Sequence, residues 1–166
     1  MQFVGSYPDI IKQEWIDFLL TEQGQLLPNN RECLHPDSCT DEQVITMHKI
    51  WGIENRAYWY KFDPADMPFT IPWPVQLTNN IDWWVVKQLP GQCVPLHYDP
   101  NDQNKTVRYV LMLQDYIPGH MLLWNNELIK DYKAGDLFKV DDVNSYHGSS
   151  NISNEARIIA HLTVWN

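Results

Sequence analysis

Five short apolar runs follow one another through the second half of the chain, separated by segments rich in glycine, proline, asparagine and aspartate. The runs cover residues 83–89, 109–113, 121–124, 137–140 and 158–164. Apolar runs of about four to eight residues between turn residues are typical of buried strands. Their regular recurrence predicts a sandwich or jelly roll from about residue 81 onward.

The first 80 residues have a different pattern. Apolar positions in 8–20 have helical spacing and predict a first helix. Thr40 and Gln43 form a capping box that predicts a second helix over 41–51. Residues 56–77 combine an aromatic cluster with four prolines, which predicts a long loop without helix or central strand. We expect this loop either to form one wall of a substrate groove or to cover the sheet.

These patterns fit one domain of 166 residues, with a helical and loop support region over 1–80 and a β core over 81–166. The predicted fold class is therefore mainly β with N-terminal helices. The formal net charge of −9 opposes binding to nucleic acid or to an anionic membrane surface. Three cysteines without paired spacing, no signal peptide and no membrane-spanning run predict a soluble, cytoplasmic protein.

Candidate chemistry lies in the β region, where His97 and Asp99 are two residues apart and His147 follows. Residues two apart on a strand point to the same side, so His97 and Asp99 can reach one metal ion. Two histidines and one carboxylate form the triad that holds non-heme Fe(II) and leaves coordination positions open. A chance His-x-Asp pair in a surface loop is the alternative. Four further residues, Cys33, His35, Cys39 and His48, match no standard zinc spacing.

Arg157 follows His147 by ten residues, at the start of the last apolar run. The intervening segment 148–156 is rich in Gly, Ser and Asn, and it predicts a hairpin that places His147 and Arg157 on neighbouring strands. A guanidinium is suited to bind the distal carboxylate of a 2-oxo acid chelated at the metal. Arg108 is the alternative candidate for binding this carboxylate. The alternation of side chains along the last strand also directs His161 toward such a pocket, with a hydrogen-bonded core histidine as the alternative role.

With these residues in place, segment 81–165 resembles the double-stranded β-helix core of Fe(II)- and 2-oxoglutarate-dependent oxygenases, a cupin-like jelly roll. The prolyl-hydroxylase branch is the nearest, and the segment after His147 is also similar to the phytanoyl-CoA hydroxylase group. The resemblance rests on His97-Tyr98-Asp99, the step at Gly135-Asp136, His147, and Arg157 leading into 162–165. It covers about half the chain.

The chain departs from the prolyl-hydroxylase pattern at two positions. Where that branch offers a tyrosine to the cosubstrate, the matching position holds Met112, so the hydrogen bond must come from elsewhere or be absent. A common Gly-Gly pair is replaced by Gly119-His120. That change brings an imidazole either to the pocket mouth or merely to a turn, and we expect the turn.

The resemblance implies that Fe(II), held by His97, Asp99 and His147, binds 2-oxoglutarate and O2 and hydroxylates a C–H bond, with release of succinate and CO2. The substrate would be a peptide or small molecule, with proline one possibility. Two alternatives remain open: a cupin-like metal enzyme that does not use 2-oxoglutarate, and a non-catalytic jelly-roll binding module. The sequence leaves the substrate and the oligomeric state undetermined.

Overall fold

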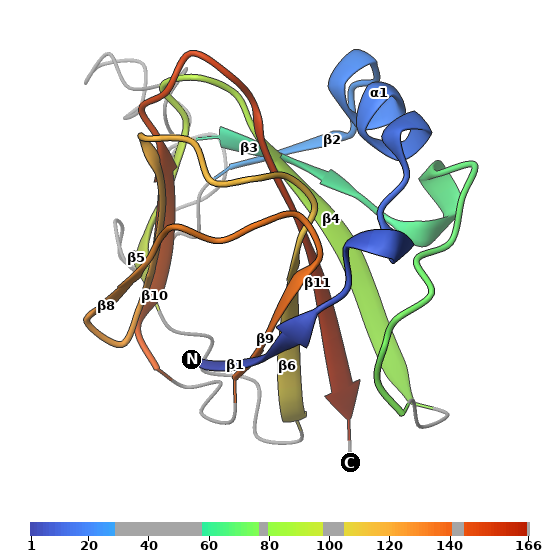
Figure 1. Cartoon of the computed structure of the whole chain (residues 1–166). Helices are drawn as coiled ribbons and strands as arrows, with labels where there is room; N and C mark the ends of the chain where they lie inside the picture. The colour runs from blue at the N-terminus through green and yellow to red at the C-terminus, as the bar shows by residue number, and fades with distance from the viewer. Residues whose placement is uncertain (29–57, 77–79, 98–104, 141–144, 166) are drawn as a thin grey trace, which may run out of the picture.

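The structure, a computed structural model, describes residues 1–28, 58–76, 80–97, 105–140 and 145–165 (Figure 1). In these ranges the chain forms eleven strands, one α-helix and two short 3-10 helices. The strands are β1 (Gln2–Ser6), β2 (Gln25–Pro28), β3 (Tyr58–Phe62), β4 (Ile81–Gln88), β5 (Cys93–His97), β6 (Lys105–Met112), β7 (His120–Trp124), β8 (Glu127–Ile129), β9 (Asp136–Val140), β10 (His147–Asn151) and β11 (Arg157–Trp165). The helices are α1 (Gln13–Thr21) and the 3-10 turns Pro8–Ile10 and Pro64–Asp66.

Two antiparallel sheets make up the molecule, one on each side of the view in Figure 1. The large sheet has the order β1-β9-β6-β11-β4-β3-β2, and the small sheet has the order β5-β10-β7-β8. Counted from β4 to β11 as strands one to eight, the central part of the large sheet reads six, three, eight, one and the small sheet reads two, seven, four, five. This alternation between sheets defines a double-stranded β-helix, so the predicted jelly roll is confirmed.

The outer face of the large sheet carries the main apolar core. Trp15, Ile16 and Leu19 of α1 pack there, together with Ile71 and Trp73 of the proline-rich segment. The predicted first helix is thus present, but it begins at Gln13 because Pro8–Ile10 forms a 3-10 turn. The second predicted helix, over 41–51, lies outside the described residues.

The expectation that 56–77 contains no central strand is wrong for Tyr58–Phe62. These residues form β3, which pairs with β2 on one side and β4 on the other. The strand is possible because the prolines begin only at Pro64, after Asp63. Every residue of β3 therefore keeps a backbone N–H that can donate to a neighbouring strand. The proline-rich remainder covers the sheet, which favours the covering role over a groove wall.

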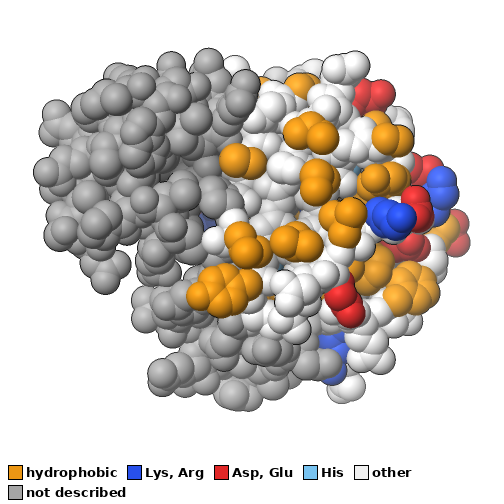
Figure 2. All heavy atoms as spheres, turned by 90° about the vertical axis from the view of Figure 1, so that its left-hand side faces the viewer, with side chains coloured by type: hydrophobic (Ala, Val, Ile, Leu, Met, Phe, Trp, Pro, Cys, Tyr) orange, Lys and Arg blue, Asp and Glu red, His pale blue; other side chains and the backbone are white. Residues whose placement is uncertain are grey.

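The inner face of the large sheet packs against the small sheet. Val86, Val110, Met112 and Ile159 of the large sheet form a second buried cluster with Leu122 of β7. The opposite, outer face of the small sheet exposes apolar side chains, visible in Figure 2 as separated patches. The two inner faces therefore enclose the interior in which a jelly-roll site lies.

Candidate functional site

Alternation along the strands places the predicted site residues on the inner faces. Ile159 belongs to the inner cluster, so Arg157 and His161 share its face of β11. By the same parity Arg108 shares the face of Val110 on β6. The inward direction expected for these three side chains is consistent with the two-sheet arrangement.

His147 is held by two contacts at the start of β10. Its ring stacks on Trp124 of β7 at 4.2 Å between ring centroids and 10° between ring planes. Its Nδ1 lies 3.0 Å from the carbonyl oxygen of Ser145, which can only accept a hydrogen bond. Nδ1 therefore carries the proton in the neutral ring, and Nε2 carries the lone pair that a metal would need. A ligating histidine is typically oriented in this way.

The backbone register brings the two predicted histidine ligands together. His97 ends β5 and is the direct cross-strand partner of His147 on β10. The structure describes His97 by its backbone, and Asp99 falls in 98–104, outside the described residues. Within the described ranges no three His, Cys, Asp or Glu side chains form a group that could hold a metal. All three metal ligands thus stay predictions from the sequence.

The hairpin predicted between His147 and Arg157 is wrong. β10 belongs to the small sheet and β11 to the large sheet, so the chain crosses between layers here. Part of the polar segment is strand, because β10 continues to Asn151. The Asn151 side chain then closes the turn by donating to Gln88 O at 2.9 Å and Glu155 O at 2.7 Å. His147 and Arg157 therefore lie on the inner faces of different sheets rather than on neighbouring strands of one sheet.

Arg157 is 1% exposed, and its guanidinium is only partly satisfied. Nη1 donates to Gln88 Oε1 at 2.8 Å, and the Tyr132 hydroxyl also lies close to the guanidinium, but Nε and Nη2 are buried without a hydrogen bond of good geometry. The amide nitrogen of Gln88 is also buried without one. Burial lowers the pKa of Arg157, but a guanidinium stays protonated in proteins. A buried cation with free donors is the arrangement that an anionic ligand completes.

Two residues beside Arg157 were not predicted as part of the site. Tyr132, between β8 and β9, is 3% exposed, and its hydroxyl is close enough to Arg157 for a weak hydrogen bond but forms none of good geometry. Burial raises the pKa of Tyr132, and the charge of Arg157 and this contact act in the opposite direction. His120 closes the expected turn by donating from its backbone N to Ile117 O at 2.9 Å, but its side chain is buried at the start of β7. Burial is the main cause that lowers the pKa of His120, and the Arg157 charge adds to it. Tyr132 lies in a polar connection between strands, where no local pattern distinguishes it.

Arg108 and His161 lie farther along the sheet. Arg108 pairs in register with Thr163, six positions from Arg157 along β11, or about 20 Å of strand. Its guanidinium lies 5.7 Å from the centre of the Trp84 ring, and His161 stacks on the same ring at 5.3 Å. Arg157 and Arg108 therefore occupy different parts of the interior and cannot serve one carboxylate together.

A cleft of about 230 Å³ opens near the His147 end of the interior. Its lining includes Trp124 and Ser145, the two residues that hold the His147 ring, and Val140, the cross-strand partner of Arg108. A small molecule in this cleft would lie against the support of the predicted metal ligand. Among the described residues, no helix is long and apolar enough to span a membrane.

Comparisons with known proteins give distant structural similarities. No family model matches the chain, and no curated protein matches it. A predicted oxalate decarboxylase from Thermotoga maritima is similar in structure, with 16% identity over 66% of this chain and 82% of that one, and a TM-score of 0.45. The Cupin_2 domain of an XRE family transcriptional regulator from Enterobacter cloacae has 11% identity, coverages of 65% and 97%, and a TM-score of 0.47.

A Cupin 2 conserved barrel domain protein from Salinispora arenicola is similar at 13% identity, over 65% of this chain and 76% of that one, with a TM-score of 0.43. All three TM-scores lie below 0.5. The jelly-roll assignment therefore rests on the strand order of this chain.

Proposed function

We propose that the chain is an Fe(II)- and 2-oxoglutarate-dependent oxygenase that hydroxylates a C–H bond of a small-molecule or peptide substrate. Arg157 carries this proposal, because a fully buried guanidinium that has no buried carboxylate beside it in the described residues, and whose Nε and Nη2 lack hydrogen bonds of good geometry, is costly without an anionic ligand. The net charge of −9 favours a neutral or cationic primary substrate over nucleic acid.

His97, Asp99 and His147 would hold the metal ion. The donor set of two imidazoles and one carboxylate suits Fe(II), and the geometry of His147 fits this role through its bond to Ser145. Iron bound with 2-oxoglutarate supplies the oxidising power that inserts one oxygen atom of O2 into the substrate, while the second leaves in succinate with loss of CO2. The chain itself contributes orientation and exclusion of water.

Arg157 would hold the distal carboxylate of 2-oxoglutarate. Asn151 bonds to the Gln88 carbonyl, and Gln88 is the cross-strand partner of Arg157, so Arg157 lies at the Asn151 end of β10. His147 is four residues away on β10, or about 13 Å of strand. An extended arginine side chain and a five-carbon acid together are suited to this separation. The apolar wall of Met112, Leu122 and Ile159 would keep water away.

A cupin-like metal enzyme that does not use 2-oxoglutarate is the second candidate. The bond from Arg157 Nη1 to Gln88 Oε1 favours it, because a purely structural arginine is expected to be tied to a neighbouring strand in this way. In that case the metal would serve another reaction, and Arg157 would only brace β11 against β4.

Anaerobic titration with Fe(II) and 2-oxoglutarate separates these candidates. We expect the absorption band of the iron chelate to appear in the parent protein and to disappear in His147→Ala. Ser150→Ala, on the same strand, should leave the band unchanged. Metal binding without a band would favour the cupin-like enzyme. No response of the parent to Fe(II) or Mn(II), by band or by thermal shift, would leave the non-catalytic binding module.

A further inference from the structure

We propose that Tyr132 forms the closed end of the cosubstrate pocket and sets the length of the 2-oxo acid that the protein accepts. This inference rests on the proposed function and extends it to the specificity of the site. It starts from the polar atoms around Arg157 that are buried without a partner.

Four buried side chains meet at this end of the interior. Gln88 is bonded to Arg157, and both Tyr132 and His120 lie close enough to interact with its charge. Each of the four has a polar atom buried without a hydrogen bond of good geometry: Gln88 Nε2, His120 Nδ1, the Tyr132 hydroxyl, and Arg157 Nε and Nη2. Each such group left unsatisfied in the interior is unfavourable. His120 Nε2 faces the Glu155 carbonyl oxygen, so in the neutral ring Nδ1 is an acceptor, and the donors at this end are Gln88 Nε2, the Tyr132 hydroxyl and the Arg157 guanidinium. A carboxylate, with four lone-pair directions, can accept from several of these donors at once.

Neighbouring residues hold the Tyr132 side chain in place. Its ring packs edge-on against Tyr116 at 5.4 Å, and its carbonyl oxygen accepts a hydrogen bond of 2.9 Å from the Tyr116 amide. Its ring also belongs to the inner apolar cluster with Met112 and Ile159. The phenol therefore cannot swing away from Arg157 without disrupting packed neighbours.

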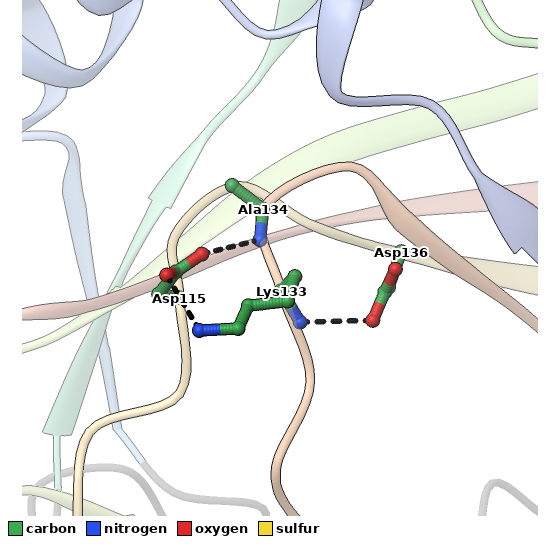
Figure 3. A network of polar contacts seen from close by, with 4 residues as sticks. All are labelled: Asp115, Lys133, Ala134 and Asp136. Atoms are coloured by element: carbon green, nitrogen blue, oxygen red, sulfur yellow. Dashed lines mark hydrogen bonds and ion pairs between the residues drawn. The ribbon is translucent and has the colours of Figure 1, made fainter.

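A polar network outside the pocket holds the segment that carries Tyr132 (Figure 3). Asp115 accepts hydrogen bonds from Ala134 N at 2.9 Å and from Lys133 Nζ at 3.0 Å. Asp136 accepts from Lys133 N at 2.8 Å. Lys133 directly follows Tyr132, so Asp115 is a positioning residue for the tyrosine, and it acts without touching a ligand.

A pocket closed at one end and fixed at the other selects chain length. In the proposed pocket, the pairing of β5 and β10 would set the metal end, and Arg157 and Tyr132 would set the anion end. One extra methylene in such a closed apolar site typically costs about 1–3 kcal/mol, or roughly 10–200-fold in binding. The parent should therefore bind 2-oxoglutarate more tightly than 2-oxoadipate, which is one methylene longer.

The test compares the dissociation constants of these two acids in the anaerobic Fe(II) chelate. Tyr132→Phe should weaken 2-oxoglutarate binding about tenfold through loss of the hydroxyl and keep the preference for length. Tyr132→Leu should shorten the side chain and lower the preference for 2-oxoglutarate over 2-oxoadipate at least tenfold. Asp115→Asn should weaken both acids, and the matched surface change Lys130→Ala should weaken neither.

A second measurement tests the anion site without any metal. With EDTA present, glutarate should raise the melting temperature of the parent and raise it less in Tyr132→Phe. A parent that binds 2-oxoglutarate, with unchanged affinity in Tyr132→Phe and unchanged length preference in Tyr132→Leu, overturns the role of Tyr132 and leaves the proposed function standing. A parent that binds neither 2-oxoglutarate nor glutarate overturns both.

Discussion

The buried imidazole of His120 shows how a single residue can link folding to pH. Its Nε2 lies 3.4 Å from the Glu155 carbonyl oxygen, a long contact, and its Nδ1 is unpartnered. Burial disfavours the charged ring and lowers the pKa of His120, with the positive charge of Arg157 acting in the same direction. The ring is thus expected to be neutral in the folded protein at pH 7.

Acidification should destabilise the protein through His120. As the pH falls from 7 through the ordinary histidine range, the unfolded chain takes up a proton that the folded chain resists, so the free energy of unfolding decreases. Urea denaturation at a series of pH values, in EDTA, should show a shallower decrease for His120→Gln than for the parent. Identical slopes for the two proteins would contradict the assignment.

Lys87 is a second buried cation, and its partners are structural. Its Nζ donates to the carbonyl oxygens of Leu19, at 2.6 Å, and Glu22 at the end of α1, and it lies over the rings of Tyr60 and Phe62. These contacts tie α1 to the large sheet. Burial nonetheless lowers the pKa of Lys87, with the Glu22 charge opposing that change.

Lys87→Met should destabilise the fold by about 1–3 kcal/mol, because it leaves carbonyl oxygens of α1 without their donor. The loss would appear in the midpoint of urea denaturation. Lys130→Met, at an exposed lysine, should change the free energy of unfolding by less than about 0.5 kcal/mol. Equal effects of the two substitutions would show that Lys87 does not brace the helix.

At the scale of elements, the pairing of β5 with β10 decides whether the two histidines meet. Gly148 follows His147, and a Cβ there would lie 3.0 Å from backbone atoms of Leu96 and Val94. Backbone in a paired sheet yields less readily than a side-chain end. The glycine thus allows the close approach of β5 that keeps His97 opposite His147.

Gly148→Ala should push β5 away from β10 and weaken metal binding at least tenfold. The expected loss of folding stability is about 1–3 kcal/mol, as for other overpacked sites. Thermal shift with Mn(II) would report both effects. Ser150→Ala, two positions along the same face of β10, should change neither, so a comparable loss of metal binding in both variants would argue against this role of Gly148.

The apolar runs predicted the strands of the core well because each is bounded by turn residues. β4, β6, β7, β9 and β11 lie within a few residues of their predicted runs. β3 was missed because the prolines that follow Phe62 masked its alternation, and β10 was missed because Ser, Gly and Asn are common in turns. The change of sheet between β10 and β11 depends on tertiary packing, which no local pattern encodes.

The candidate site was predictable only where residue type implies chemistry. His147, Arg157, Arg108 and His161 lie on the inner faces as strand parity requires. Tyr132 could not be found, because an isolated aromatic residue in a polar connection has no periodicity to fix its direction. His120 was visible in the sequence, but its burial depends on the sheet opposite.

For the molecule as a whole, charge is distributed unequally between surface and interior. The net charge is −9, yet in the described ranges the buried ionic side chains are Lys87, Arg108 and Arg157, with no buried Asp or Glu. A cation that is buried without a full set of partners lowers stability unless a ligand supplies the missing interactions. Arg157 fits this description best, whereas Lys87 is satisfied by α1.

Replacing Arg157 separates a functional cation from a structural one. If the arginine serves a ligand, Arg157→Met should change the ligand-free stability by less than about 1 kcal/mol, because the desolvation cost of the charge offsets the lost bond to Gln88. A structural role predicts a loss of about 1–3 kcal/mol, because the buried Gln88 carbonyl loses its donor when the guanidinium is removed. The variant should also lose the stabilisation by 2-oxoglutarate, which for the parent at 100 times the dissociation constant is about 2.7 kcal/mol.

The control variant Arg108→Met should keep the stabilisation by 2-oxoglutarate. Urea denaturation with and without the acid measures both quantities, and a response lost in Arg108→Met but kept in Arg157→Met would move the carboxylate site to the other end of the interior.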